Sequence, residues 1–270
     1  MVLILYEMQK IVLVCSLLSL YVACSPLERK RPDVSDHTYH EGAIIRGDTA
    51  KKNLALVFTG DEYADGASQI LTVLENQRIH GSFFLTGKFY RNEEFRTLIK
   101  QLSSSGHYLG AHSDQHLLYC DWEKRDSLLV SSSEFRVDLE NNYKAMSVFG
   151  IHQEEAPYFL PPYEWYNDSI AAWTGFMGLQ LINYTPGTLS HADYTLPGTQ
   201  EYKSSRDIYQ SIMEFENNQP GGLNGFILLS HVGSSPQRGD KFYYLLDELI
   251  GELKQKGYTF VRIDELLAGP

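Results

Sequence analysis

Strand-length apolar runs alternate with helical segments along most of this chain. Residues 54–58 (LALVF) form a continuous apolar run that ends near Gly60, which is typical of a strand buried on both faces. Similar runs predict strands at residues 81–87, 108–111, 158–160, 179–184, 226–230 and 259–263, and helical periodicity predicts helices at residues 67–77, 92–104, 125–148 and 242–256. This alternation predicts an α/β fold with parallel strands.

Polar residues follow four of the predicted strands. Asp61, His112, Tyr163 and His231 each come shortly after an apolar run. In parallel α/β folds, chemistry gathers at the carboxyl ends of the strands. The sequence therefore predicts a functional site at this edge of the sheet.

Two of the histidines have the spacing of a metal-ligand pair. His112 and His116 are four residues apart, which would place both imidazoles on one face of a helical turn. Imidazole is a common ligand of zinc, cobalt, nickel and iron. Nine histidines in 270 residues also produce pairs by chance, so the surrounding residues decide the interpretation.

Those surrounding residues resemble the polysaccharide deacetylases, the NodB-homology enzymes of carbohydrate esterase family 4. Five segments match the family's motifs in order: residues 81–87 (GSFFLTG), 106–116 (GHYLGAHSDQH), 159–168 (FLPPYEWYND), 227–231 (ILLSH) and 256–266 (KGYTFVRIDEL). The resemblance covers residues 54–267 and implies a distorted (β/α) barrel of seven or eight mainly parallel strands. It implies a metal-dependent hydrolase that removes N- or O-linked acetyl groups from a polysaccharide or oligosaccharide.

The first family motif, T-F-D-D-G, is altered in this chain. In the family its first Asp is the general base and its second Asp binds the metal, whereas the stretch here runs Thr59-Gly60-Asp61-Glu62. Counting back from the following helix makes Asp61 the ligand and leaves Gly60 at the base position. Counting forward from the strand places Thr59 and Gly60 at the two Asp positions, and a third alignment makes Asp61 the base and Glu62 the ligand.

We favour Asp61 as the third metal ligand beside His112 and His116, because a site with two histidines needs one carboxylate. The expected cofactor is one divalent ion, zinc first, with cobalt, nickel or iron as alternatives. Such a ligand set leaves coordination positions open for water and for an acetyl oxygen.

The resemblance also implies roles around the metal. His231 corresponds to the general acid, and the backbone N–H of Tyr163 corresponds to the donor that holds the oxyanion. Glu164, next to Tyr163, is expected to face the substrate. Glu62 is the tentative base, with Glu164 and Asp65 as alternatives.

Other family residues are missing from their motifs. Leu160 stands where the family has the Arg that orients the base, and residues 183–186 (NYTP) contain no acid where the family has one. The set predicts a rearranged site that still holds metal. The competing hypothesis is an inactive carbohydrate-binding relative that keeps the fold. A metalloprotease is disfavoured because the chain has no HExxH motif.

The N-terminus has the pattern of an export signal. Lys10 precedes an apolar run at residues 11–23, and residues 21–24 (YVAC) resemble a bacterial lipobox that ends at Cys24. We therefore expect a signal peptide at residues 1–23, a polar tether at residues 24–53 and a catalytic domain at residues 54–270. The mature protein would be a periplasmic or cell-surface lipoprotein of a bacterium, anchored to the membrane only through Cys24.

Charge limits the partners. The net charge is −11, with 34 acidic side chains against 23 Lys and Arg, which argues against nucleic acid and against polyanionic glycans. An acetylated glycan built from neutral or amino sugars is compatible with this balance. Removal of the signal would leave Cys120 and Cys24, the latter lipidated, so no intrachain disulfide is expected.

Overall fold

The computed structural model describes residues 37–268, so the predicted signal peptide and Cys24 lie outside the described residues. Its strands are β1 (Thr38–His40), β2 (Ala43–Arg46), β3 (Asn53–Gly60), β4 (Ser82–Leu85), β5 (Tyr108–Ala111), β6 (Tyr158–Phe159), β7 (Gln180–Leu181), β8 (Phe226–His231) and β9 (Thr259–Phe260). Its α-helices are α2 (Ala67–Gln77), α3 (Gly87–Arg91), α4 (Arg96–Ser104), α5 (Ser132–Ser147), α6 (Asp168–Phe176), α7 (Ser205–Asn218), α8 (Leu246–Gln255) and α9 (Ile263–Leu266). Short 3₁₀ turns occupy η2 (Glu93–Phe95), η3 (Pro162–Glu164), η4 (Ser190–Ala192) and η5 (Phe242–Leu245).

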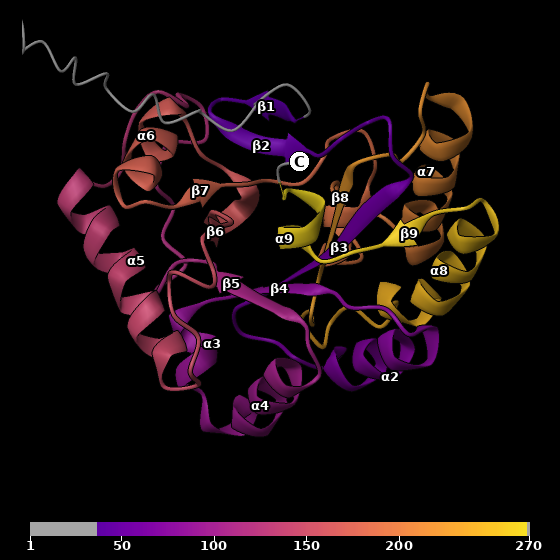
Figure 1. Cartoon of the computed structure of the whole chain (residues 1–270), viewed down its shortest axis with the longest axis horizontal. Helices are drawn as coiled ribbons and strands as arrows, with labels where there is room; N and C mark the ends of the chain where they lie inside the picture. Colours follow the sequence, from indigo (N-terminus) through magenta and orange to yellow (C-terminus); the bar gives the residue numbers. More distant parts are fainter. Residues whose placement is uncertain (1–36, 269–270) are drawn as a thin grey trace, which may run out of the picture. The chain divides into compact units, whose positions relative to one another are not determined.

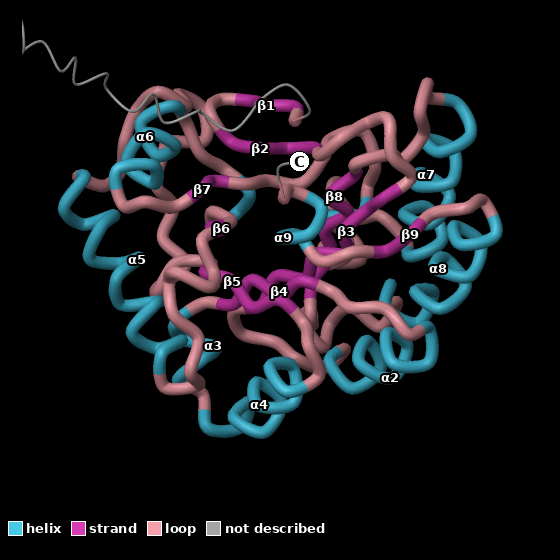
Figure 2. The backbone as a smooth tube through the Cα atoms, in the orientation of Figure 1, coloured by secondary structure: helices cyan, strands magenta, loops and turns pink. Residues whose placement is uncertain are grey.

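The described strands form one curled sheet with helices around its outside (Figures 1 and 2). The strand order is β1-β2-β8-β3-β4-β5-β6-β7, with β9 beside β3. Strands β3 to β9 pair in parallel, whereas β2 pairs with β1 and β8 in antiparallel fashion. A bridge between Ile44 and Ile182 joins the two ends of the curl. The fold is therefore a distorted (β/α) barrel, which confirms the predicted fold class.

Strand β3 lies in the middle of the sheet and pairs with β4, β8 and β9. Its apolar residues are buried as predicted, and Phe58 stacks on Phe83 of β4 at 5.0 Å between ring centroids. Parallel neighbours that share a register point to the same face of a sheet. Thr59 is level with His231 of β8, so these two side chains leave the same face at the same end of the barrel.

The predicted domain boundary lies too late. Strands β1 and β2 fall inside the segment predicted as a polar tether, and Ala43 and Ile44 are buried core residues. The short apolar group at residues 43–45 completes the sheet, although its flanking residues are polar. The ordered domain thus begins before residue 54.

Several element ends also differ from the sequence prediction. Helix α5 begins at Ser132 and not at Arg125, because Ser131 and Glu134 form a capping box that fixes the first turn. The predicted strand at residues 259–263 ends at Phe260 and gives way to α9. Helices α6 and α7, which cover the barrel opposite one another in Figure 1, were not predicted.

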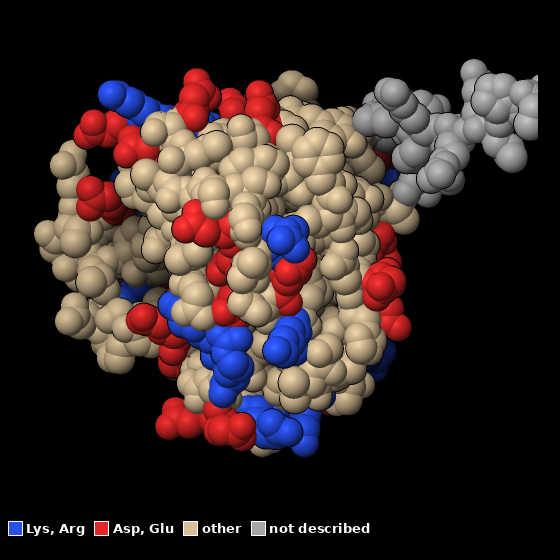
Figure 3. Space-filling model, turned by 90° about the vertical axis from the view of Figure 1, so that its left-hand side faces the viewer, with Lys and Arg blue, Asp and Glu red and all other residues tan. Residues whose placement is uncertain are grey.

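Charges are mixed on the outer surface. Figure 3 shows acidic and basic side chains side by side on the face that lies at the left of Figure 1, without a field of one sign. A typical pair is Arg136 with Glu140, 3.0 Å apart on α5 and exposed to solvent. Among the described residues, no helix has the length and apolar content needed to cross a bilayer.

Candidate active site

A cleft of about 760 Å³ opens at the carboxyl ends of the strands. Its walls come from the loops after β3, β5, β6, β7 and β8, so the predicted edge of the sheet does carry the site. Aromatic side chains make up much of the lining: Tyr63, Trp122, Tyr163, Trp165, Tyr184 and Tyr194. A cleft with this lining fits a ligand with flat apolar faces and a polar rim, such as a sugar ring.

The histidine pair lies at the end of β5, but the expected helical turn is absent. Residues 112–117 are a loop in which Ser113 and His116 have left-handed backbone φ of 73° and 57°. The ring centroids of His112 and His116 are nevertheless 5.1 Å apart. The structure therefore brings the two imidazoles together by a strained loop and not by helical spacing.

A buried carboxylate on α5 holds this loop. Asp138 accepts hydrogen bonds from the Ser113 hydroxyl at 2.7 Å and the Tyr119 hydroxyl at 2.7 Å. It also accepts from the backbone N–H groups of Asp114 and Gln115 at 3.2 and 3.0 Å. These four bonds offset the cost of burying Asp138 and fix the conformation that the loop requires. Asp138 lies inside a helix, where no local pattern in the sequence marks it as part of the site.

The two imidazoles have the chemistry that a divalent metal requires. The Nδ1 of His112 lies 2.8 Å from the carbonyl oxygen of Leu160, which can only accept, so Nδ1 carries the proton and Nε2 keeps its lone pair. Burial lowers the pKa of His112 well below its ordinary value and lowers that of His116 to about 4. Both rings are therefore neutral at neutral pH, as metal ligands must be.

The expected third ligand, Asp61, is engaged by other partners. Its Oδ1 accepts a hydrogen bond from the Thr86 hydroxyl at 2.8 Å, and its Oδ2 lies 3.5 Å from the Lys88 ammonium. It lines the cleft together with His116. Within residues 37–268, no group of three or more His, Cys, Asp or Glu side chains is arranged to hold a metal ion. The two histidines fit a metal, whereas Asp61 would have to release Lys88 to complete the set.

The end of β3 bears on the two alignments that place Thr59 or Gly60 at an Asp position of the family motif. Strand β3 runs to Gly60, and Asp61 follows it in the loop. A side chain at position 60 would meet Leu85 and Phe89 at 2.8 and 3.1 Å, so glycine leaves room for this packing. The hydroxyl of Thr59 is buried without a hydrogen-bond partner in the described structure. Neither Thr59 nor Gly60 supplies a base.

His231 forms a close pair with an acid that the sequence analysis missed. Its Nδ1 lies 2.6 Å from Oδ1 of Asp193, and its backbone N–H donates to Oδ2 of the same side chain at 2.9 Å. Burial alone would lower the pKa of His231, but the charge and hydrogen bond of Asp193, together with the charge of Glu164, raise it. An acid does reach this end of the sheet, supplied by Asp193 and not by residues 183–186.

The Pro-Pro turn after β6 places Tyr163 and Glu164 in the cleft. Both residues have left-handed backbone, with φ of 59° and 53°, a costly conformation for side chains of this size. The Tyr163 ring packs edge-on against the His116 ring, with 4.4 Å between the ring centroids. Burial raises the pKa of Glu164 to about 7, with a further increase from Asp193 and an opposing effect of His231.

The other two candidate bases differ in position. Glu62 is exposed at the rim of the cleft. Asp65 does not line the cleft. Its carboxylate lies 2.8 Å from the Lys241 ammonium and accepts hydrogen bonds from the Ser234 N–H and the Tyr243 hydroxyl. Asp65 is therefore held by structural contacts, whereas Glu164 lines the cleft.

Comparison with known proteins agrees with this architecture. The family model described as "Polysaccharide deacetylase" matches residues 46–182. The chain is 30% identical over 227 residues to an uncharacterised 30.6 kDa protein of Geobacillus stearothermophilus, which covers 84% of this chain and 75% of that protein. It is 25% identical over 226 residues to the peptidoglycan-N-acetylmuramic acid deacetylase PdaA of Bacillus subtilis, covering 83% and 75% of the two chains.

A solved structure shares the fold at lower sequence identity. The wild-type BA3943 protein of Bacillus anthracis, described as a CE4 family pseudoenzyme, superposes with a TM-score of 0.65 at 21% identity. The match covers 86% of this chain and 70% of that one. This similarity is one of fold.

Proposed function

This chain belongs to the polysaccharide deacetylase family, and on that premise we propose that it is an exported, metal-dependent hydrolase that removes N- or O-linked acetyl groups from a polysaccharide or oligosaccharide. The observation that carries the proposal is the set of side chains that meet at one end of the barrel. His231, paired with Asp193, and the neutral pair His112 and His116 converge on the same end of the barrel. Proton donation and carbonyl activation are the two functions that deacylation needs.

His112, His116 and Asp61 are the residues that would hold the metal ion. A bound divalent metal supplies an acidic water and polarises the acetyl carbonyl. The imidazole tautomer set by Leu160 keeps the Nε2 lone pair of His112 available for it. We propose zinc, with cobalt, nickel or iron as alternatives.

The proton transfers belong to Glu164 and His231. A base works best when its pKa is near the working pH, and Glu164 at about 7 meets this condition. Asp193 holds Nδ1 of His231, which leaves Nε2 to carry the proton that the departing amine or alcohol requires. Tyr163, at the strained turn beside His116, is the proposed source of the oxyanion N–H.

The exposed aromatic residues support a glycan substrate. Trp122, Tyr163 and Tyr194 each leave between 44% and 54% of their surface exposed while lining one cleft. Exposed aromatic rings of this kind stack on the apolar faces of sugars. Because PdaA, which is 25% identical to this chain, deacetylates peptidoglycan, a bacterial wall glycan is one candidate substrate.

One observation favours a second function, glycan binding without hydrolysis. The Lys88 ammonium already neutralises Asp61, and Thr86 occupies the other carboxylate oxygen. If this arrangement persists in solution, the histidines lack their third ligand. The chain would then retain the aromatic cleft and the fold but not the reaction.

Metal content and acetate release separate the two functions. The wild-type protein should bind about one zinc per chain and release acetate from acetylated chitin, xylan or peptidoglycan fragments. His112→Ala should lose most of the metal, measured by elemental analysis after dialysis. His152→Ala, which changes an exposed histidine far from the cleft, is the matched control and should retain it.

Full metal occupancy in His112→Ala would contradict the ligand assignment. Metal binding without acetate release from any of these substrates would favour the binding protein. Export and a lipid anchor at Cys24 are part of the proposal, and they rest on the N-terminal sequence alone.

A further inference from the structure

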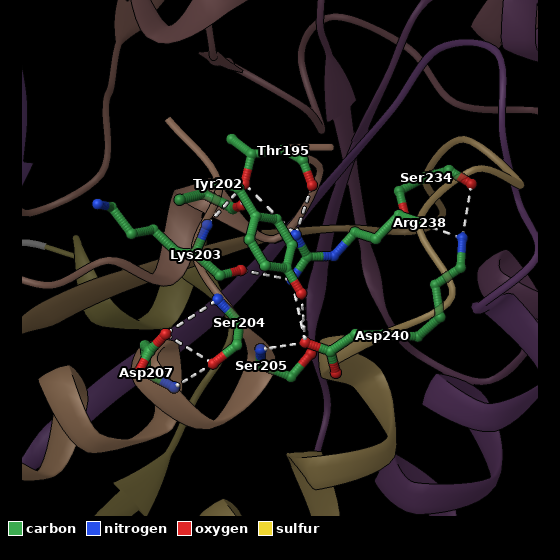
Figure 4. A network of polar contacts seen from close by, with 11 residues as sticks. Thr195, Tyr202, Lys203, Ser204, Ser205, Asp207, Ser234, Arg238 and Asp240 are labelled. Carbon is green, nitrogen blue, oxygen red and sulfur yellow. Dashed lines mark hydrogen bonds and ion pairs between the residues drawn. The ribbon is translucent and has the colours of Figure 1, made fainter. Parts of the chain in front are cut away.

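A charged arginine is buried beside the cleft without a part in the mechanism above. Arg238 lies in the loop after β8, seven residues beyond His231, and its side chain is fully buried. Figure 4 shows its guanidinium between Thr195 and Lys203, with the ring of Tyr202 close to it. Burial of a charge is costly, so an arginine in this position needs a reason.

Arg238 bonds to both ends of the segment at residues 195–203, which forms one wall of the cleft. Its Nη1 donates to the carbonyl oxygen of Thr195 at 2.5 Å, and its Nη2 donates to the carbonyl oxygen of Lys203 at 2.8 Å. The residues between these carbonyls include Leu196, Thr199 and Glu201, which line the cleft. A planar guanidinium can bond two separate acceptors in a fixed geometry, which a lysine ammonium cannot reproduce.

The charge of Arg238 is only partly balanced. Asp240 lies 3.9 Å away and is shared with the Tyr202 hydroxyl and the backbone N–H of Ser205. The Tyr202 ring lies 5.1 Å from the guanidinium carbon. The Nε of Arg238 has no hydrogen-bond partner among the described residues. This arrangement is a poor one for stability alone, because a buried donor left unpaired destabilises the folded state.

A short chain of hydrogen bonds leads from Arg238 to the catalytic pair. Thr195, held by Arg238, donates through its backbone N–H and its hydroxyl to the carbonyl oxygen of Ala192, at 3.1 and 2.7 Å. Ala192 directly precedes Asp193, whose carboxylate holds both the ring and the backbone N–H of His231. The end of β8 and the loop after it therefore contact residues 193–195 at two points, through His231 and through Arg238.

The same loop is fixed on its other side, so it can act as a rigid support. The Lys241 ammonium lies 2.8 Å from Asp65 and donates to the carbonyl oxygen of Ser234 at 2.8 Å. The backbone N–H of Ser234 donates to Asp65 at 2.8 Å. These contacts tie the loop to the segment that follows β3.

We propose that Arg238 is a positioning residue for the reaction: it holds residues 193–203 against the loop after β8 and thereby orients Asp193 toward His231. The inference rests on the proposed deacetylase function, because it assigns His231 a role in proton transfer. It predicts that loss of the guanidinium fork loosens one wall of the cleft and weakens the Asp193–His231 pair without touching the substrate.

The test compares Arg238→Lys with Arg46→Lys. Arg46 is a matched control, because its guanidinium also donates to two backbone carbonyls, those of Asn224 and Gly222, but it lies outside the cleft. Two readouts need no activity: the NMR titration of the His231 ring, and the rate of limited proteolysis between residues 195 and 203. Arg238→Lys should shift the His231 titration toward lower pH and speed proteolysis at least about tenfold, whereas Arg46→Lys should change neither.

A second variant, Thr195→Val, removes the hydroxyl that connects Arg238 to Ala192 and should give the same shift of smaller size. In the enzyme assay, kcat should fall, because the proton donor His231 is less well oriented. An unchanged His231 titration and unchanged proteolysis in folded Arg238→Lys would overturn the proposal. If wild type releases no acetate, the two structural readouts still decide whether Arg238 positions the pair, so the failures are distinguishable.

Discussion

At the scale of single residues, the cleft raises the pKa of the proposed base, Glu164, and of the proposed acid, His231, through different causes. Burial is the main cause of the raised pKa of Glu164. For His231, burial lowers the pKa, and the charge and hydrogen bond of the Asp193 carboxylate raise it. A neutral-pH reaction needs such a separation of environments, because the base must be ionised while the acid keeps its proton. The charges of Glu164 and His231 also affect each other: His231 lowers the pKa of Glu164, and Glu164 raises the pKa of His231.

The first residue-scale prediction concerns proton donation. His231→Ala should keep the bound metal and lower acetate release by ~10²–10⁴, because the leaving group loses its general acid. Asp193→Asn should lower the rate less, since the imidazole remains. An activated aryl ester needs no proton on its leaving group, so its hydrolysis should be affected least. Equal losses for amide and aryl ester substrates would contradict this role.

The second residue-scale prediction concerns stability. The folded-state pKa of Glu164 is about 7 against 4.5 for the ordinary carboxyl, so the free energy of unfolding should fall as pH rises from about 4.5 to about 7. Glu164→Gln removes this dependence and should be more stable than wild type above pH 7, by up to about 3 kcal/mol. Urea unfolding at pH 4 and pH 8 measures the difference. Glu62→Gln, at the exposed rim, is the control and should leave the pH dependence unchanged.

The residues at this end of the sheet could be predicted from the sequence more reliably than their contacts. His112, His116, Tyr163, Glu164 and His231 all lie at the predicted end of the sheet, because apolar strands lead into them. The partner of His231 was missed, since Asp193 follows an irregular segment in which neither strand nor helix periodicity gives a register. Contacts between distant loops depend on the closed barrel and leave no local pattern.

At the scale of elements, the site depends on a helix that never enters it. Helix α5 supplies Asp138 to the loop after β5 and Asn142 to the backbone of His112, whose N–H donates to Asn142 at 2.8 Å. The amide of Asn142 also donates to the carbonyl oxygen of Leu85 on β4. One face of this helix thus joins the ends of two neighbouring strands.

The element-scale prediction removes that anchor. Asp138→Ala leaves the donors of Ser113, Asp114, Gln115 and Tyr119 without their acceptor, and should lower the free energy of unfolding by at least about 3 kcal/mol. Metal affinity should fall as well, because the loop that carries both histidines relaxes. Denaturant unfolding and metal titration provide the measurements.

Glu140→Ala is the control on the same helix. Glu140 is exposed and pairs only with Arg136, so its removal should cost less than about 1 kcal/mol. Similar losses of stability in the two variants would show that Asp138 acts through the helix and not through the loop.

Strands and helices could be told apart from the sequence where the apolar residues keep a single period over the whole element. Strand β3 and helix α2 were predicted nearly to their ends, because their apolar residues repeat with a single period. Strands β6 and β7 have two residues each, too few to show alternation. Helix α5 was extended too far at its start, since the capping residue Ser131 decides the boundary and periodicity does not.

At the scale of the whole molecule, charge should select among glycans. The chain carries a net charge of −11, and the acidic residues of the cleft lining are Asp61, Glu62, Glu164 and Glu201. No Lys or Arg appears in the lining contributed by residues 37–268. A substrate that bears carboxylates would therefore meet repulsion both at long range and in the cleft.

We expect a neutral N-acetylglucosamine oligomer to bind more tightly at low salt than an oligomer of equal length that bears carboxylates. The difference should shrink as salt rises above about 0.1 M, because the Debye length falls to about 10 Å and the repulsion is screened. Calorimetric titration at two ionic strengths measures both affinities. Tighter binding of the carboxylated oligomer at low salt would contradict the prediction.

The pairing of β3 with β8 governs when the cleft can exist during synthesis of the protein. Thr59 and His231 are neighbours in the sheet, yet more than half of the chain separates them. Strand β4 is synthesised soon after β3, but the other edge of β3 stays open until β8 has been synthesised. Such long-range pairing folds slowly. Nascent chains of this protein should depend on chaperones until the last quarter of the sequence has emerged.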